Sequence, residues 1–253
     1  MSETVIAAQM YTLREHLATR SQMVESCRRV KKMGYDAIEA ASFGPIEVAD
    51  LAKLLRDEGL VCAGTHVSIE MMETVESCLA YQETLNCTSM AISGFAPNQA
   101  TAGDWGDFAR RYSKVASPFL ERGMSVSYHA HSHELVSYGD KTALDILIEK
   151  TDPAISFELD TYWITHGGGD PAAWIDKVSG RIPLVHCKDM AITQDRHQKM
   201  CEVGSGNQNW PRILESCRKA GVRWYVVERD DGDLDPFDSL QISLENLHLM
   251  GLS

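Results

Sequence analysis

Met124-Ser-Val-Ser-Tyr-His-Ala-His-Ser-His-Glu134 begins as a short β-prone run and ends in three histidines and a carboxylate. Alternate side chains of an extended strand share a face, so His129, His131 and His133 could all point to one spot. Such polar side chains are costly inside a core unless they are paired. The neighbouring strands must therefore be searched for residues that could meet these histidines.

On both sides of this stretch, runs rich in Val, Ile, Ala and aromatic residues alternate with amphipathic stretches of about 10 to 19 residues. The predicted strands are Val5–Met10, Ala37–Ala41, Val61–Ser68, Ser89–Ser93, the stretch quoted above, Ile155–Tyr162, Ile182–Cys187 and Trp224–Glu228. The predicted helices are Ser21–Met33, Ile46–Glu58, Met71–Leu85, Trp105–Arg122, Lys141–Lys150, Asp170–Lys177, a segment from Asn209 to Gly221, and one from Asp235 through Leu249.

Eight strand–helix pairs without a hydrophobic hairpin or a linker predict an α/β fold, a single (β/α)8 TIM barrel domain over residues 1–253. An open doubly wound sheet is the alternative. That fold usually carries a glycine-rich phosphate turn after an early strand, whereas the first strand here runs into Tyr11-Thr-Leu-Arg14.

Composition and net charge indicate which classes of partner the protein can bind. The net charge of −12 and the pI near 5.2 disfavour nucleic acid and anionic lipid. Seven scattered cysteines without a Cys-x-x-Cys pair predict reduced thiols. The N-terminus lacks the features of a signal peptide and no apolar run is long enough to span a membrane, so we expect a cytoplasmic protein with neither nucleic acid nor membrane partners.

Polar residues gather where the predicted strands end, which is where a (β/α)8 barrel places its chemistry. They are Gln9, Glu39, His66, His129, His131, Glu134, Glu158, Asp160, Tyr162, His186, Lys188, Asp189, Glu228 and Asp230. Carboxylates at short range raise one another's pKa, and a divalent metal ion is the simpler way to compensate them. A set of oxygen and imidazole donors suits Mn²⁺, Co²⁺, Mg²⁺ or Zn²⁺. Such an ion would polarise the carbonyl of a sugar-like substrate and stabilise an enediolate.

Several motifs in the same order resemble the sugar phosphate isomerase/epimerase group of the xylose-isomerase-like TIM barrels, which are relatives of tagatose epimerase and endonuclease IV. The motifs are Ser127-Tyr-His-Ala-His-Ser-His-Glu134, Phe157-Glu-Leu-Asp160-Thr-Tyr-Trp163, Pro183-Leu-Val-His186-Cys-Lys-Asp-Met190, Glu202-Val-Gly-Ser-Gly206 and Tyr225-Val-Val-Glu228-Arg-Asp230. Ala8–Arg14 and Met33–Glu39 match as well, so the resemblance extends over essentially the whole chain.

This resemblance implies one divalent ion, with Mn²⁺ preferred, held at the ends of strands five to eight by Glu, Asp, His and Glu. Asp160, His186 and Glu228 match the last three positions. The chain departs from the group at the first, where His129 aligns with the strand-five glutamate. We predict Glu134 as the fourth ligand because a third carboxylate balances the ion, and keep His129 as the alternative.

The resemblance also implies roles around the ion. Glu228 and a strand-five histidine, His131 or His129, would exchange the substrate proton. Predicted substrate contacts are His66, Glu39, Trp163, which could stack on a sugar ring, and Lys188, which could bind a phosphate or a hydroxyl. Glu158 could instead be a buried partner of a histidine. Barrels of this group are often homo-oligomers, so the same is expected here.

The predicted function is therefore a metal-dependent isomerase or epimerase of a small carbohydrate. A lyase of the same architecture, either a dehydratase or a keto-glycoside-cleaving enzyme, is the alternative, because it removes the same proton and then expels a leaving group. A nuclease related to endonuclease IV is disfavoured by the acidic surface. A barrel without catalytic activity is the remaining hypothesis.

Overall fold

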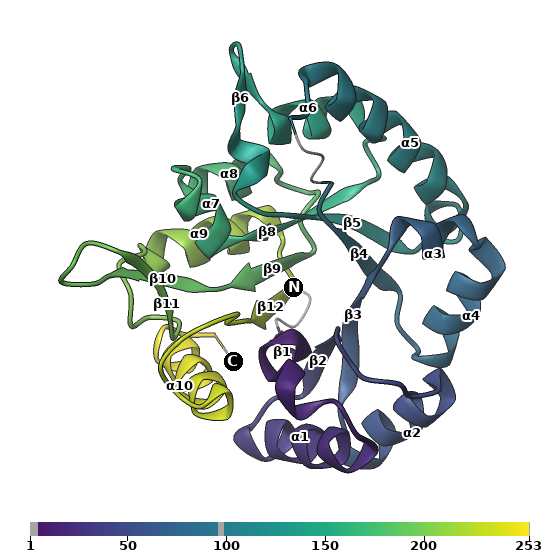
Figure 1. Cartoon of the computed structure of the whole chain (residues 1–253), viewed down its shortest axis with the longest axis vertical. Coiled ribbons are helices and arrows are strands. Elements are labelled where there is room, and N and C mark those ends of the chain that lie inside the picture. Colours follow the sequence, from purple (N-terminus) through teal and green to yellow (C-terminus); the bar gives the residue numbers. More distant parts are fainter. Residues whose placement is uncertain (1–4, 96–98, 253) are drawn as a thin grey trace.

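Eight parallel strands close into a barrel with helices around its outside in the computed structural model, which describes residues 5–95 and 99–252 (Figure 1). The single (β/α)8 barrel predicted from the sequence is confirmed. Around the barrel the strands follow the order β1, β12, β9, β8, β5, β4, β3, β2. They are β1 (Val5–Gln9), β2 (Ala37–Ala40), β3 (Val61–Val67), β4 (Ser89–Ser93), β5 (Ser125–Ala130), β8 (Ser156–Asp160), β9 (Leu184–Cys187) and β12 (Trp224–Val227).

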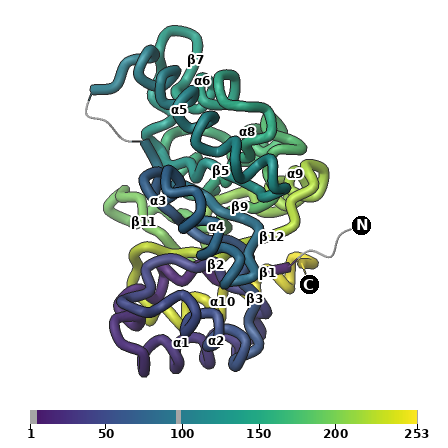
Figure 2. Tube along the Cα trace, turned by 90° about the vertical axis from the view of Figure 1, so that its right-hand side faces the viewer, coloured from purple at the N-terminus to yellow at the C-terminus, as the bar shows by residue number. Residues whose placement is uncertain are grey.

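The helices form the outer ring, with α1 and α2 at one end of the molecule and α5 and α6 at the opposite end (Figure 2). The α-helices are α1 (Arg20–Met33), α2 (Val48–Glu58), α3 (Ile69–Glu73), α4 (Val75–Thr84), α5 (Ala102–Leu120), α6 (Ala143–Lys150), α7 (Thr161–His166), α8 (Pro171–Lys177), α9 (Trp210–Ala220) and α10 (Pro236–Leu249). Two 3-10 segments, η1 (Met10–His16) and η2 (His133–Leu135), follow β1 and β5.

Local capping explains where two helices differ from prediction. The helix expected over Met71–Leu85 is two helices, because Ser68 caps the first one and Thr74 interrupts the helical dihedrals with φ −96° and ψ 69°. Helix α5 begins at Ala102 rather than Trp105. Thr101 and Asp104 form a capping box there, each side chain accepting from the other's backbone N–H.

The end of the sixth barrel strand also differs. The strand expected to reach Tyr162 ends at Asp160, whose side chain accepts the Trp163 N–H at 2.9 Å and starts α7. Tyr162 therefore lies on a helix and does not share a strand face with Asp160. The sequence also missed two antiparallel hairpins, namely β6 (Ser137–Tyr138) with β7 (Lys141–Thr142), and β10 (Asp189–Ile192) with β11 (Gln198–Cys201).

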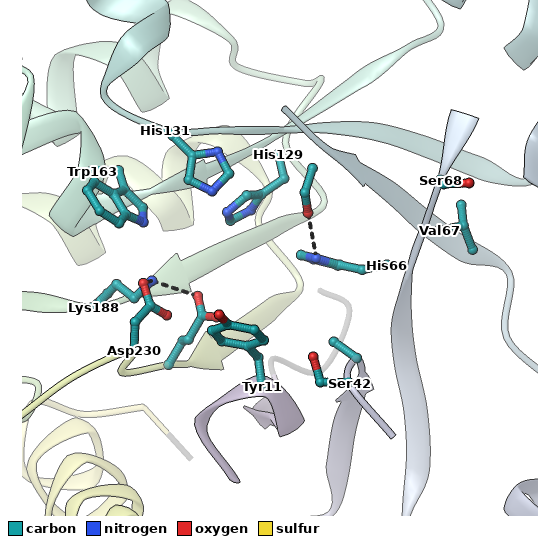
Figure 3. A pocket seen from close by; sticks show the side chains of 13 residues that line it. Tyr11, Ser42, His66, Val67, Ser68, His129, His131, Trp163, Lys188 and Asp230 are labelled. Atoms are coloured by element: carbon teal, nitrogen blue, oxygen red, sulfur yellow. Dashed lines mark hydrogen bonds and ion pairs between the residues drawn. The ribbon is translucent and has the colours of Figure 1, made fainter. Parts of the chain in front are cut away.

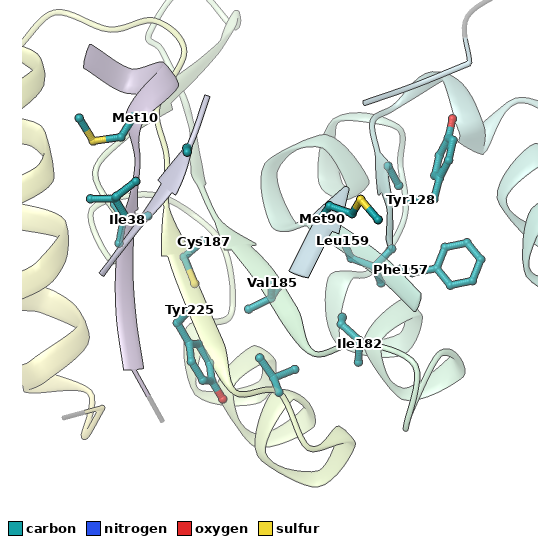
Figure 4. Close-up of a cluster of buried hydrophobic side chains, with 14 of the residues drawn as sticks. Met10, Ile38, Met90, Tyr128, Phe157, Leu159, Ile182, Val185, Cys187 and Tyr225 are labelled. Atoms are coloured by element: carbon teal, nitrogen blue, oxygen red, sulfur yellow. The ribbon is translucent and has the colours of Figure 1, made fainter. Parts of the chain in front are cut away.

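Two apolar regions support the barrel. The larger lies between strands and helices, where Phe157, Tyr225 and Met90 are among its buried side chains (Figure 4). All seven cysteines fall in the described ranges, and each is a buried free thiol. A smaller cluster consists of Ala7, Ala37, Ala63, Leu184 and Val226. Two residues further along four of these strands come Gln9, Glu39, His186 and Glu228, so the same strand faces turn from apolar to polar toward their carboxyl ends.

Candidate active site

The centre of the site is Glu158, a buried carboxylate on β8 that meets three histidines from three other strands. Its Oε1 lies 2.9 Å from His66 Nε2 of β3, 2.7 Å from His129 Nδ1 of β5 and 3.0 Å from His186 Nε2 of β9. We call these four residues the inner cluster. All but His66 are buried.

The charges of the inner cluster stabilise one another. Burial alone would raise the pKa of Glu158, but His186 and His66 hold that pKa well below its usual range. Burial alone would lower the pKa of His66, but Glu39 and Glu158 outweigh it and raise the pKa to about 10. The same balance, with Glu158 and Glu39 as the opposing charges, raises the pKa of His186. Without a bound cation, protonation of His66 and His186 is therefore favoured.

Glu39 of β2 lies beneath the inner cluster rather than on the wall of the cavity. Its Oε2 accepts from Gln9 Nε2 at 2.6 Å and lies 2.7 Å from His186 Nε2. The neighbouring strand carries Gly64, where a Cβ would fall 2.8 Å from Glu39 Oε1. A glycine is thus required for Glu39 to reach His186.

Four residues at the carboxyl ends of adjacent strands could hold a divalent ion, and they are His129, Asp160, His186 and Glu228. Each is buried and offers one donor atom, and the four atoms lie within 4.8 Å of one another. Asp160 Oδ2 is buried without a hydrogen-bond partner, which suits an oxygen that would bind a cation. His186 Nε2 is held by Glu39 and Glu158 while Nδ1 lies 2.8 Å from Glu228 Oε2, the pattern of a ligand oriented by a carboxylate behind it. The donor set fits the predicted ion.

Glu134, the predicted fourth ligand, is not among these four. It lies in η2, fully buried, and its Oε1 accepts the Tyr128 hydroxyl at 2.6 Å and lies 3.1 Å from His133 Nε2. Its Oε2 accepts the backbone N–H of His131 at 2.8 Å. We call Glu134, Tyr128 and His133 the outer cluster. The structure thus brings the alternative residue, His129, to the other three donors.

Lys188 follows β9 and extends its ammonium group toward the same carboxylates. Its Nζ lies 3.1 Å from Asp160 Oδ2, 2.9 Å from Glu228 Oε2 and 2.8 Å from Asp230 Oδ2. Burial would lower the pKa of Lys188, but Asp160 and Glu228 raise it above its usual value. Lys188 is therefore charged, and it cannot serve as a base at neutral pH.

A cavity of about 630 Å³ opens above these residues (Figure 3). Its lining includes His66, His129, His131, Trp163, Lys188 and Glu228 from the sequence prediction, together with Tyr11, Ala41, Ser42, Val67, Ser68, Ser93 and Asp230. No motif or spacing in the sequence points to a role for Tyr11 or for the three serines. Single hydroxyl residues outside a motif are difficult to recognise as site residues from sequence, because such residues also occur in turns and helix caps.

His131 lies on the cavity wall between His129 and Trp163. The ring centroids are 4.6 Å from His129 and 5.7 Å from Trp163, and Nδ1 is buried without a partner. Burial, with the nearby charges of His129 and Lys188, lowers the pKa of His131 to about 2. His131 is thus a neutral imidazole, and its unpartnered Nδ1 is available to hydrogen-bond with a bound molecule.

Asp189 is a buried carboxylate that fixes the loop formed by Glu202–Gly206. Its Oδ2 accepts from Gly204 N at 2.9 Å, Gly206 N at 3.0 Å and Trp210 Nε1 at 2.6 Å, and its Oδ1 accepts from Met190 N at 2.7 Å. A Cβ on Gly206 would collide with Asp189 and with the Met190 carbonyl. The family-like glycines in this loop therefore serve the attachment to Asp189.

Comparison with known proteins agrees with the barrel fold. A family model described as "Xylose isomerase-like TIM barrel" matches residues 27–249. The chain belongs to this family. Among curated proteins, the rhizopine catabolism protein MocC of Rhizobium meliloti is 27% identical over 164 residues, which is 58% of this chain and 50% of that protein. The inosose dehydratase of Clostridium tetani is 34% identical over 91 residues, 36% of this chain and 30% of that protein. The matches thus span half or less of these relatives.

Solved structures of this barrel family extend the likeness of fold to the whole chain. A sugar phosphate isomerase/epimerase from Parabacteroides distasonis superposes with a TM-score of 0.83 at 21% identity and covers 100% of this chain and 96% of that one. An IOLI protein with a binding zinc atom gives a TM-score of 0.72 at 13% identity, with 98% of each chain covered.

Within the described residues, no helix has both the length and the apolar character to cross a bilayer.

Proposed function

We propose that this chain is a divalent-metal-dependent isomerase or epimerase that transfers a proton on the carbon next to the carbonyl of a sugar or keto-sugar. The observation that carries the proposal is the juxtaposition of His129, Asp160, His186 and Glu228 with the neutral, unpartnered imidazole of His131. A Lewis acid site beside a neutral base is what proton removal next to a carbonyl requires.

Each residue has a role that follows from its environment. An ion bound by the four donors would polarise the carbonyl and stabilise the negative charge of the enediolate. His131 accepts the proton on one side of the cavity. Glu228, whose pKa is held low against burial by Lys188 and His186, is the carboxylate available on the other side. Lys188 donates to a substrate oxygen, and Trp163 provides an aromatic face for a sugar ring.

His66 and Glu39 have supporting roles in this proposal. His66 Nε2 binds Glu158 and its Nδ1 lies 2.9 Å from Ser93 Oγ, so the ring is held in one orientation on the cavity wall. Glu39 does not line the cavity and orients His186 instead. Both residues thus place other groups, with His66 also presenting its ring to a bound molecule.

A lyase is the second candidate, and a specific pair of observations favours it. The curated relatives include inosose dehydratases, and Asp230 offers an acid at the mouth of the cavity. Burial and the charge of Glu228 raise the pKa of Asp230 to about 6, so this carboxyl could protonate a departing oxygen. The lyase shares the first proton transfer with the isomerase and differs in what leaves.

The test is solvent deuterium exchange. Protein loaded with Mn²⁺ is incubated in D₂O with a panel of ketoses, inososes and 3-keto-glycosides, and deuterium at the carbon next to the carbonyl is followed by NMR. We expect wash-in with the wild-type protein, loss of wash-in with His131→Gln and retention with His133→Gln, which removes a neighbouring histidine outside the inner cluster. An epimer or aldose product indicates an isomerase, and an unsaturated product or released aglycone a lyase. No exchange with any member of the panel would refute both.

A further inference from the structure

The positively charged groups of the cavity that would receive the substrate are already paired, His66 with Glu39 and Glu158, and Lys188 with three carboxylates. Lys188 is the one lysine or arginine among its lining residues in the described part of the chain, and residues 1–4, 96–98 and 253 include no lysine or arginine. Its ammonium already lies within 3.1 Å of three carboxylates. Lys188 is therefore outnumbered by carboxylates, and the same carboxylates would balance the proposed divalent ion, so neither cation has charge left over for an anionic substrate group.

Backbone amides that could bind a phosphate are occupied by the chain itself. TIM barrels often bind phosphate in the loops after the seventh and eighth strands. After the seventh strand here, β9, the amides of Gly204 and Gly206 donate to Asp189. After the eighth, β12, the chain continues as Arg229-Asp-Asp-Gly-Asp-Leu-Asp235, with four carboxylates in seven residues. Both places are closed to phosphate, one by hydrogen bonding and the other by charge.

The start of α7 and the run Gly167–Gly169 are two further segments that do not offer a phosphate site. The first turn of α7 has its Trp163 amide capped by Asp160. The run Gly167–Gly169 packs under Leu135 and Trp174, because a Cβ on Gly167 would fall 2.7 Å from Leu135 Cδ1 and one on Gly169 2.8 Å from Trp174 Nε1. These glycines therefore allow close packing rather than a phosphate loop.

The nearest arginines are also engaged. Arg14 Nη2 donates to the Asp230 carbonyl at 2.6 Å, and Arg229 Nη1 lies 2.6 Å from Glu202 Oε1. Both line a separate cavity of about 140 Å³, together with Asp230, Asp231 and Glu15. This cavity is too acidic to serve as an anion site next to the larger one.

The polar atoms left without partners indicate what the site does accept. Asp230 Oδ1 is a buried acceptor without a hydrogen bond, and Asp160 Oδ2 has only the Lys188 ammonium nearby, at 3.1 Å. Besides a cation, such atoms need O–H or N–H donors, which sugar hydroxyls supply. An ionised phosphate or carboxylate has only acceptor oxygens and cannot satisfy them.

We infer that the substrate is an uncharged polyhydroxylated carbonyl compound, carrying neither phosphate nor carboxylate. This inference rests on the proposed function for the carbonyl, whereas the charge selectivity follows from the lining alone. The volume of about 630 Å³ lies in the range of sites for drug-sized ligands, roughly 300 to 1,000 Å³, so the site has space beyond a single small triose.

The test compares matched neutral and phosphorylated ligands. Saturation-transfer NMR with the Mg²⁺-loaded wild-type protein is recorded for fructose, tagatose, ribulose and scyllo-inosose, and for fructose 6-phosphate, tagatose 6-phosphate and ribulose 5-phosphate. We expect transfer to at least one neutral compound and at least tenfold weaker binding of its phosphate ester. Stronger binding of the esters overturns the inference, and so does a panel in which no neutral compound binds.

Charge variants test whether the carboxylates around Lys188 are what weakens the binding of phosphate esters. In Asp230→Asn, the ammonium of Lys188 is less neutralised, so we expect the phosphate esters to gain affinity severalfold. The matched control is Asp233→Asn, an exposed member of the same acidic run whose side chain is 87% exposed and only loosely paired with Lys199. It should leave ester binding unchanged. Equal effects of the two variants, or none in Asp230→Asn, would contradict the assignment, and thermal melting of both variants verifies folding.

Deuterium exchange in the same samples separates this inference from the proposed function. Neutral compounds that bind without any exchange contradict the proposed function and leave the charge selectivity standing. Exchange that occurs with phosphate esters and is absent with neutral compounds contradicts the inference and leaves the proposed function standing.

Discussion

Glu158 and Glu134 are both buried glutamates that meet histidines, yet they contact opposite faces of β5. Glu158 contacts the inward-facing His129, next to the cavity. Glu134 contacts Tyr128, whose ring packs edge-on against Phe108 and Tyr112 of α5. Adjacent residues of one strand thus serve two clusters with different consequences, one beside a candidate metal site and one that fixes the loop after the strand.

The two carboxylates differ in how their hydrogen-bonding capacity is used, and that difference bears on which residues we propose as ligands. Glu134 receives hydrogen bonds at both oxygens from groups that must be satisfied inside the protein. Asp160, by contrast, has one buried oxygen, Oδ2, that receives no hydrogen bond and has the Lys188 ammonium at 3.1 Å. This difference in hydrogen bonding is the reason that we propose Asp160 rather than Glu134 as a ligand.

The largest expected effect is the loss of metal binding in Asp160→Asn. The amide can still cap α7 through its oxygen but no longer offers a charged ligand, so we expect Mn²⁺ affinity to fall by more than about 100-fold, beyond the range typical of residues that only support a ligand. Isothermal titration calorimetry measures it. Affinity equal to that of the wild-type protein would remove Asp160 from the proposed site.

Glu158→Gln should have a smaller effect on the same quantity. Glu158 is not one of the four proposed ligands, but it orients His129 and His186, and loss of such a partner typically costs about 10- to 100-fold in metal affinity. Titration of both variants with Mn²⁺ shows which of them loses more affinity for the ion. A loss larger than that of Asp160→Asn would indicate that Glu158 binds the ion directly.

Glu134→Gln should affect stability rather than metal binding. An amide group would place N–H donors opposite either the Tyr128 hydroxyl or the His131 amide, and the resulting unsatisfied group costs about 1 to 3 kcal/mol. Urea unfolding measures the change, with Glu149→Gln at an exposed ion pair as the control. If Mn²⁺ affinity fell as far as in Asp160→Asn, Glu134 would be the fourth ligand after all.

The smallest effect concerns His133 and pH. A hydrogen bond to Glu134 raises the pKa of His133 above the usual 6.5, so the protonated form is favoured in the folded state. Its contribution to stability is complete below about pH 6.5 and is lost as the pH rises through the folded-state pKa. His133→Gln should thus destabilise the protein more at about pH 5.5 than at about pH 9 in urea unfolding. The effect is small because 36% of the side chain is exposed, and the reverse order would contradict the ion pair.

The sequence was sufficient for the barrel and for most residues of the site, because polar side chains at strand ends recur with a period of two. His129, Asp160, His186 and Glu228 could be found in this way. The alternation of side chains holds only within the strand, so the direction of the Glu134 side chain, which lies beyond the end of β5, could not be predicted from it. It depends on η2, a 3-10 turn that directs the carboxylate back to Tyr128.

Other differences also arise just beyond strand ends. The switch from β8 to α7 depends on a single side chain, since Asp160 caps the helix as well as facing the site. The strands of the β10–β11 hairpin, Asp-Met-Ala-Ile and Gln-Lys-Met-Cys, are short and lack apolar–polar alternation, so the sequence does not predict this hairpin. Strand ends are where local propensity is weakest and where side-chain hydrogen bonds determine the path of the chain.

The attachment of Asp189 to Gly204, Gly206 and Trp210 limits where the chain can be lengthened. Because one carboxylate holds both the start of β10 and the segment leading into α9, displacements at the exposed hairpin tip, residues 194–197, need not reach Lys188. Insertions at this exposed tip should therefore be tolerated while the reacting groups stay in place. The hairpin is therefore the natural position for grafting a new recognition segment onto this barrel.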